Sequence, residues 1–344
     1  MDRYTLYWRK CEEILMIDYR KEMEKCTQCG ECTAHCTFLQ KYHLDFSLQQ
    51  IERLKELSYS CFLCGTCKIH CPEAIDGSEI MQALRAECVN IDGQELVPTG
   101  FEKMIEEKAD YLYKNYHYAN QKSVIFMGCN FPAYFPKTAQ RISEYFLKYY
   151  QIGTVYECCG KPIMDLGLSK KAEKSLDQLI ERMRSHQIEE VITVCPNCDS
   201  YLKKNSSMRV VTILQKIKEL KIGNPIDYKD AYIFQACPDR EKGEWMELVQ
   251  DFFSQKVQRI ETIQCCGLGG CAKAKEPELA RGFTDQLPKG SNKRIYTYCA
   301  SCAGNFRRNG CTNVRHILPE ILGLRFEEAD IQHNGENRKD TKNW

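Results

Sequence analysis

Residues 190–202 read EVITVCPNCDSYL, and residues 294–306 read RIYTYCASCAGNF. Each stretch begins with a short β-branched or aromatic run, passes through a Cys-x-x-Cys pair and continues into helix-forming sequence. Similar apolar runs lie on either side, and amphipathic segments with helical spacing separate them. Short apolar strands that alternate with helices are typical of a buried parallel sheet. The pattern therefore predicts an α/β fold with cysteines at the carboxyl ends of its strands, where open α/β sheets place their sites.

The sequence around these stretches repeats once. SVIFMGCN (123–130), TVYECCGKP (154–162) and RVVTILQKIKEL (209–220) recur as AYIFQACPD (231–239), IETIQCCGLGG (260–270) and NVRHILPEIL (313–322). Both copies keep the same order with nearly constant offsets. We therefore predict two repeated α/β, Rossmann-like domains over residues 120–228 and 229–326. The polar residues 327–344 show no periodicity, which predicts a disordered tail.

Each copy carries five cysteines. Neighbouring side chains on a strand point to opposite faces, so an adjacent Cys-Cys pair converges on one site only if the backbone turns. Gly160 and Gly267 follow the two pairs and supply that freedom. Five thiolates exceed what zinc or one cubane uses, so we infer an enlarged iron–sulfur assembly in each copy. The candidate ligands are Cys129, Cys158, Cys159, Cys195 and Cys198 in the first copy, and Cys237, Cys265, Cys266, Cys299 and Cys302 in the second.

Two more cysteine runs precede the repeat, CTQCGECTAHCT (26–37) and CFLCGTCKIHCP (61–72). This spacing is typical of a two-cluster bacterial ferredoxin, in which the fourth cysteine of each run binds the other cluster. The second run ends in Pro72, whereas the first has Thr37, which we interpret as a lost turn-stiffener. A pair of zinc sites is the alternative, but zinc favours four ligands in Cys-x-x-Cys pairs. The predicted ligands are Cys26, Cys29, Cys32 and Cys71 for the first cubane [4Fe–4S] cluster, and Cys61, Cys64, Cys67 and Cys36 for the second.

The segment between the two runs, residues 45–60, has apolar residues at helical spacing, as do residues 1–25 and 79–90. Helical linkers predict an all-α ferredoxin domain over residues 1–110 rather than a hairpin-built one. Residues 91–120 begin with turn residues and mark the boundary. The expected fold class is thus α+β multidomain, with a helical N-terminal domain followed by two α/β domains.

Composition narrows the functional class. Lys+Arg is 48 and Asp+Glu is 47, giving a formal net charge of +1, so no nucleic-acid partner is predicted. The sequence contains no uninterrupted apolar stretch of ~18 residues, so no membrane span is predicted. Attachment to a peripheral membrane complex is compatible with the sequence. The charged N-terminus does not resemble a signal peptide, so a cytoplasmic location is expected. In a reducing compartment, 22 cysteines in 344 residues indicate bound metal rather than disulfides.

Some notable residues fall outside the predicted ligand sets. We interpret Cys11 and Cys88 as packing residues, Cys311 as inert and His316 as structural. Lys161 is expected to be a solvated lysine, with stabilisation of a cluster or an anionic substrate as the alternative. Cys271 lies close to the second CCG pair. We expect it to be a packing residue, with a substrate-side role as the alternative. The glycines at 267–270 lack the context of a dinucleotide-binding loop.

Two copies of Cys–CCG–CxxC behind a double-cluster ferredoxin pattern resemble the CCG-domain iron–sulfur proteins. Over residues 20–325 the chain is similar to a heterodisulfide reductase with fused ferredoxin-like and CCG catalytic subunits. The resemblance implies that each five-cysteine set holds a noncubane [4Fe–4S] cluster. It also implies that electrons pass through the two cubanes to the two noncubane clusters, which cleave a thiol disulfide.

The same domains occur in iron–sulfur subunits of glycolate, lactate, glycerol-3-phosphate and fumarate-reductase complexes. The alternative is therefore an electron-transfer subunit of a flavoprotein dehydrogenase. We expect no flavin or nicotinamide bound by this chain, so a flavoprotein subunit is the expected electron donor or acceptor. A small-molecule disulfide or thiol is the expected substrate.

Overall fold

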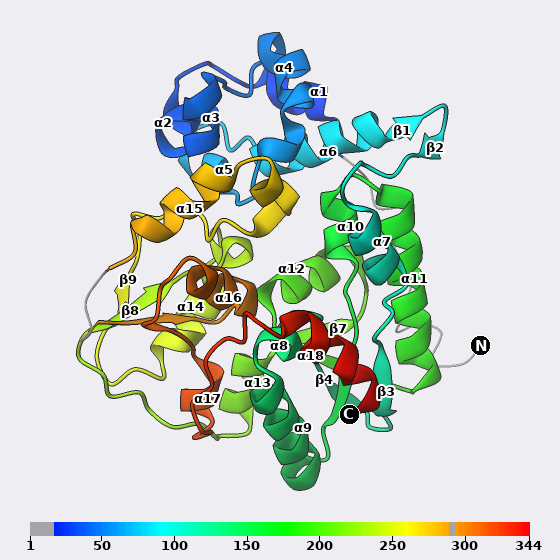
Figure 1. Cartoon of the computed structure of the whole chain (residues 1–344), viewed down its shortest axis with the longest axis vertical. Coiled ribbons are helices and arrows are strands. Elements are labelled where there is room, and N and C mark those ends of the chain that lie inside the picture. The colour runs from blue at the N-terminus through cyan, green and yellow to red at the C-terminus, as the bar shows by residue number, and fades with distance from the viewer. Residues whose placement is uncertain (1–16, 289–292) are drawn as a thin grey trace.

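The computed structural model describes residues 17–288 and 293–344. Cys11 and the first part of the predicted N-terminal helix lie outside these residues. Within them, a cap of short helices sits over two α/β units that lie side by side (Figure 1). The parallel sheets of these two α/β units are as predicted.

The N-terminal part is built from short helices around a small apolar core that includes Phe38, Leu54 and Ile80. Gly30 and Gly65 adopt left-handed backbone before α2 and α5, and both helices end at the fourth cysteine of their run. The segment between the runs is helical, and a short antiparallel hairpin, β1–β2, follows α6. The elements are α1 (Tyr19–Glu24), α2 (Glu31–His35), α3 (Thr37–Tyr42), η2 (Leu48–Gln50), α4 (Ile51–Glu56), η3 (Ser58–Ser60), α5 (Thr66–His70), α6 (Gly77–Val89), β1 (Asn90–Ile91), β2 (Gln94–Glu95) and α7 (Glu102–Ala109).

The first α/β unit has a sheet in the order β3-β5-β4-β6-β7. All neighbours are parallel except β3, which pairs antiparallel with β5 and starts before residue 120. The central strands β4 and β6 are almost entirely buried because their β-branched and aromatic side chains face helices on both sides. The elements are β3 (Asn115–Tyr118), β4 (Ser123–Phe126), α8 (Phe131–Tyr134), α9 (Pro136–Tyr150), β5 (Gly153–Tyr156), α10 (Lys161–Asp165), α11 (Ser169–Ser185), β6 (Glu190–Thr193), α12 (Pro196–Asn205), β7 (Arg209–Thr212) and α13 (Ile213–Glu219).

The second unit repeats this topology. Its parallel sheet runs β9-β8-β10-β11, so β8, β9, β10 and β11 take the places of β4, β5, β6 and β7. The internal repeat of the sequence is therefore a repeat of the fold. The elements are β8 (Ala231–Phe234), η4 (Cys237–Asp239), α14 (Glu244–Gln250), β9 (Gln258–Arg259), η5 (Gly269–Ala274), α15 (Pro277–Asp285), β10 (Arg294–Thr297), α16 (Ala300–Arg308), β11 (Val314–His316) and α17 (Leu318–Ile321).

The two units share one continuous apolar core. Ile125 and Ile192 of the first sheet belong to the same buried cluster as Ile233 and Ile295 of the second. A separate core covers the other face of the first sheet. The shared core fixes the two sheets relative to each other. The repeated cysteines lie at the carboxyl ends of their strands.

The expectation of a disordered tail is wrong. Residues 327–344 form α18 (Asn334–Asp340) and η6 (Thr341–Asn343), and this segment crosses back onto the first unit beside α8 and β3 (Figure 1). The Trp344 ring packs edge-on against Tyr156, with 5.4 Å between the ring centroids. Asn115 donates from its side-chain amide to the carbonyls of Thr341 and Trp344, at 2.7 and 2.8 Å. Specific polar contacts therefore order a segment that lacks an apolar stripe.

Candidate iron–sulfur site

The five cysteines of each copy meet in the same order. In the first unit, hydrogen-bonding contacts between thiols run from Cys129 to Cys158, Cys159, Cys198 and Cys195. In the second unit the corresponding contacts run from Cys237 to Cys265, Cys266, Cys302 and Cys299. Both members of each adjacent pair therefore face the other cysteines of their set, as the CCG motif predicts.

The backbone explains why these side chains converge. The first cysteine of each set follows β4 or β8, and the adjacent pair follows β5 or β9. Gly160 and Gly267 turn the chain directly after the pair with φ of +89° and +81°, the left-handed region that glycine adopts without strain. The strand ends of a parallel sheet meet at one edge, so the turn brings the pair toward the other cysteines.

The Cys-x-x-Cys pairs lie at helix starts. Cys195 is the N-cap of α12 and Cys299 is the N-cap of α16, each with extended backbone. Contacts from Cys198 and Cys299, followed by the backbone N–H groups of Cys198 and Asn197, lower the pKa of Cys195 well below its usual value. Free N–H groups at a helix start favour a thiolate there.

The two sets also touch each other and the N-terminal part. The Cys195 thiol contacts Cys299, so the sets join end to end at the boundary between the two units. Near the other end of the second set, Cys265, which also contacts Cys237, contacts Cys64 of the second cysteine run. Ten repeated cysteines and one ferredoxin-type cysteine therefore form one continuous line of thiol contacts.

The ferredoxin-type cysteines group across the two runs. Cys26, Cys29, Cys32 and Cys71 border one small cavity, into which Cys67 also faces. Cys36 of the first run lies among the second-run cysteines: after burial, the charges of Cys64 and Cys61 are the largest influences that raise its pKa. The fourth cysteine of each run thus lies with the other run's first three.

Among residues 17–288 and 293–344, no three His, Cys, Asp or Glu side chains are arranged to hold a single metal ion. The thiols meet pairwise instead. Buried cations nevertheless surround them. Arg85 is fully buried and donates only to backbone carbonyls, those of Ser58, Cys61, Asp165 and Gly270.

Arg240 donates to the carbonyls of Cys64 and Gln264 and to the Thr66 hydroxyl. In the described part of the chain, neither Arg85 nor Arg240 forms an ion pair with a carboxylate. Burial would lower the pKa of Arg240, but Cys237, Cys64 and Cys265 raise it above its usual value. Arg85 is buried and Arg240 is partly buried. A cation removed from water without an anion is costly, so an anionic iron–sulfur cluster fits this environment.

The first set has its own cations. Lys108 is buried and pairs with Glu107 at 2.6 Å, and burial alone would lower the pKa of its ammonium group. Cys129 and Cys158 instead raise that pKa above its usual value. Arg338 of α18 donates to the Cys129 carbonyl at 3.2 Å and to Glu107 at 3.2 Å. Positive charge therefore faces the cysteines from elements far apart in the sequence.

Lys161 corrects one expectation from the sequence. It is only partly exposed, with 24% of its side chain accessible, and its ammonium group pairs with both carboxylate oxygens of Asp165, at 2.6 and 2.8 Å. Burial would lower its pKa, but Asp165 and then Cys159 raise it. Lys161 is thus a further cation beside the first CCG pair.

Sequence reasoning missed several residues that shape the site. Arg85, Lys108, Arg240 and Arg338 carry no motif, and only the fold brings them to the cysteines. Gly128 had a local signal, since it directly precedes Cys129. Its φ is +67°, and a Cβ there would lie 3.2 Å from the Cys198 sulfur.

Cys88 and Cys271 lie outside the line of thiol contacts. Cys88 is half-buried on α6, as expected for a packing residue. Cys271 packs against the core of the first unit, and burial followed by Asp165 raises its pKa to about 11.

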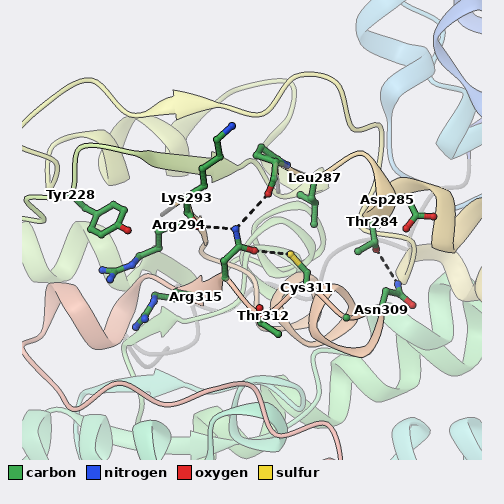
Figure 2. Close-up of a pocket in the computed structure, with 13 residues that line it drawn as sticks. Tyr228, Thr284, Asp285, Leu287, Lys293, Arg294, Asn309, Cys311, Thr312 and Arg315 are labelled. Carbon is green, nitrogen blue, oxygen red and sulfur yellow. Dashed lines mark hydrogen bonds between the residues drawn. The ribbon is translucent and has the colours of Figure 1, made fainter. Parts of the chain in front are cut away.

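A cavity of about 640 Å³ lies at the other end of the second sheet (Figure 2). Its wall includes Lys293, Arg294 and Arg315, near the amino ends of β10 and β11. Cys311 also lines it and donates to the Asn313 side chain at 3.0 Å. Because Cys299 follows the carboxyl end of β10, this cavity is separate from the cysteine site.

In the part of the chain that the structure describes, no helix is both long and apolar enough to span a bilayer.

Comparison with known proteins identifies the repeated domain. The CCG cysteine-rich domain family matches residues 123–203 and 243–307, which lie in the two α/β units. The two α/β units therefore carry CCG cysteine-rich domains, as the motifs predicted, and the chain is similar to iron–sulfur proteins that include heterodisulfide reductase subunits.

Several methanogen proteins are similar to this chain. An uncharacterized iron–sulfur protein of Methanococcus maripaludis is 25% identical over 313 residues, covering 76% of this chain and 62% of that protein. A fumarate reductase (CoM/CoB) subunit of Methanothermobacter marburgensis is 22% identical, covering 93% of this chain and 76% of the relative. A dihydromethanophenazine:CoB–CoM heterodisulfide reductase subunit of Methanosarcina mazei is 22% identical, covering 90% of this chain and 95% of that protein.

Proposed function

We propose that this chain is an iron–sulfur oxidoreductase subunit that reduces a small-molecule disulfide. The observation that carries the proposal is the continuous line of ten thiols, joined between the two units at Cys195 and Cys299. The overall reaction is R–S–S–R′ plus two electrons and two protons, giving R–SH and R′–SH. A flavoprotein subunit would supply the electrons.

We propose that the donor sets hold four [4Fe–4S] clusters. Thiolates are the usual ligands of such clusters, and the buried cations near both sets would balance their negative charge. When bound, the clusters would accept and pass on single electrons. The proposed cubane ligands are the two crossed ferredoxin-type sets, and the proposed noncubane ligands are the five cysteines of each CCG unit.

The thiol contacts also indicate the order in which the three parts of the chain are connected. The contact between Cys64 and Cys265 links the N-terminal part to the second unit, and that between Cys195 and Cys299 links the second unit to the first. We accordingly divide the chain into a ferredoxin-like part (1–110), two CCG domains (120–228 and 229–326) and a C-terminal segment (327–344). Two of the similar methanogen proteins are named as subunits of reductases, which supports the proposal that this chain acts as one subunit of a multi-subunit complex.

The test uses anaerobically purified protein. We expect about 16 irons per chain, from four four-iron clusters, and oxidation of reduced viologen by a mixed disulfide. Cys159→Ser and Cys266→Ser should each remove the iron of one set and abolish disulfide reduction. Cys311→Ser is the control, because Cys311 lies in the separate cavity. Iron near 8 per chain, or full activity in both CCG variants, would rule the proposal out.

The second candidate is an electron-transfer subunit serving a partner dehydrogenase. The similarity to the fumarate reductase (CoM/CoB) protein favours it. In that case the four clusters would load as described, but no disulfide would oxidise the reduced protein. The viologen assay therefore separates the two functions.

A further inference from the structure

The first cysteine run departs from its expected pattern at one residue. Where the second run has Pro72 after its last cysteine, the first has Thr37, the first residue of α3. Amide groups in the first turn of a helix have no partner within the helix. The Thr37 N–H donates instead to the side-chain oxygen of Gln264, at 2.8 Å, and the Thr37 hydroxyl donates to the same oxygen at 3.1 Å. A proline at this position would have no N–H to donate.

These two bonds orient the Gln264 amide. Because an N–H group can only donate, the atom that faces Thr37 must be the oxygen Oε1, and the NH₂ group must point the other way. That NH₂ group lies 3.3 Å from the Cys36 sulfur and 3.5 Å from the Cys64 sulfur. The Gln264 amide thus reaches one cysteine from each ferredoxin-type run.

The backbone of Gln264 is fixed as well. Its carbonyl accepts hydrogen bonds from Arg240, at 2.5 Å, and from the Thr66 hydroxyl, at 3.4 Å. The next residue is Cys265, whose thiol contacts Cys64. Gln264 therefore lies where the N-terminal cysteines meet the second CCG set.

We infer that Gln264 is a positioning residue that sets the reduction potential of the cluster held by Cys36, Cys61, Cys64 and Cys67. Thr37, at the position of the usual proline, orients the Gln264 amide. The inference rests on the proposed function. Hydrogen bonds to cluster sulfurs stabilise the more negative, reduced state and so raise the reduction potential. The bonds from Gln264 would favour that cluster as an electron acceptor at the entrance to the CCG units.

Redox titration followed by EPR on the cluster-loaded full chain tests the inference. Thr37→Pro removes the orienting N–H, and Gln264→Met removes the amide itself. Both variants should lower the midpoint potential of one ferredoxin-type signal and leave the other in place. Thr37→Ser keeps both donors and should match the wild type. Proline is well accepted at the first position of a helix, so Thr37→Pro should fold.

Gln40→Met is the matched control. Gln40 lies on the same helix, and its amide donates to the Ala34 carbonyl at 2.7 Å. The inference is overturned if Thr37→Pro and Gln264→Met leave both potentials unchanged, or if Gln40→Met lowers the same potential equally. A wild-type protein without ferredoxin-type signals would instead refute the proposed function. The two failures are therefore distinguishable.

Discussion

Gly160 and Gly267 make the same turn after the two CCG pairs, but their surroundings differ. A Cβ at Gly160 would lie 3.6 Å from the Ala172 carbonyl oxygen, an ordinary contact. A Cβ at Gly267 would lie 2.6 Å from the Ala280 carbonyl oxygen and 2.9 Å from the Ala280 Cα. The repeated motif thus hides a difference in packing between the two copies.

Alanine substitutions should reveal this difference. Left-handed backbone costs a non-glycine residue about 1–2 kcal/mol, which is the loss expected for Gly160→Ala. Gly267→Ala adds a backbone clash, so its free energy of unfolding should fall by about 3 kcal/mol or more. Denaturant unfolding monitored by circular dichroism measures both losses. Equal losses would contradict the packing argument.

The C-terminal helix α18 shows how one element of polar sequence becomes ordered. Arg338 donates to the Cys129 carbonyl, to the Asn130 side chain at 3.0 Å and to Glu107, and it thereby joins α18 to both α7 and the loop after β4. The helix itself is short and lacks buried side chains. Its position therefore depends on these charged and polar contacts.

Arg338→Gln should detach this helix. We expect a loss of about 2 kcal/mol in the stability of the docked segment, because a buried, charge-assisted set of hydrogen bonds is removed. Hydrogen exchange should become faster over residues 331–344, and in the cluster-free protein Cys129 should react faster with iodoacetamide. Lys339→Gln, an exposed position on the same helix with the same change in charge, is the control. Unchanged exchange in Arg338→Gln would refute the role of this contact.

In the whole molecule, Arg85 joins the three main parts. Its guanidinium group donates to Ser58 and Cys61 in the N-terminal part, to Asp165 in the first unit and to Gly270 in the second, at 2.5–3.1 Å. The carbon atom of this group also lies 4.9 Å from the centre of the Tyr59 ring. One side chain therefore connects all three cysteine-bearing parts of the chain.

Arg85→Met should leave these carbonyls without a donor. A loss of about 4 kcal/mol in the free energy of unfolding is expected, since each unsatisfied buried acceptor costs about 1–3 kcal/mol and some will find water. Arg85→Lys should recover only part of this loss, because an ammonium group cannot reproduce the planar fork of donors. Thermal unfolding of the cluster-free protein measures both effects. Full stability in Arg85→Met would show that the three parts are held together by other contacts.

Local pattern was enough to predict much of this protein. Strand–helix alternation, the duplication and the position of Cys195 and Cys299 before helices all follow from residues close together in the chain, and the structure agrees. The left-handed turns at Gly160 and Gly267 were predictable for the same reason. Each of these features depends on backbone preferences and side-chain periodicity, which act over a few residues.

Other features depend on residues far apart and appear only in the folded chain. The contacts of Cys195 with Cys299 and of Cys64 with Cys265 require the two units and the N-terminal part to pack together. The cations Arg85, Arg240 and Arg338 have no motif, because a buried charge is selected by the groups that surround it rather than by its sequence neighbours. The docking of α18 was missed for this reason: its polar composition predicts disorder, and the groups that order it, among them the Cys129 carbonyl and the Glu107 carboxylate, are far away in the sequence.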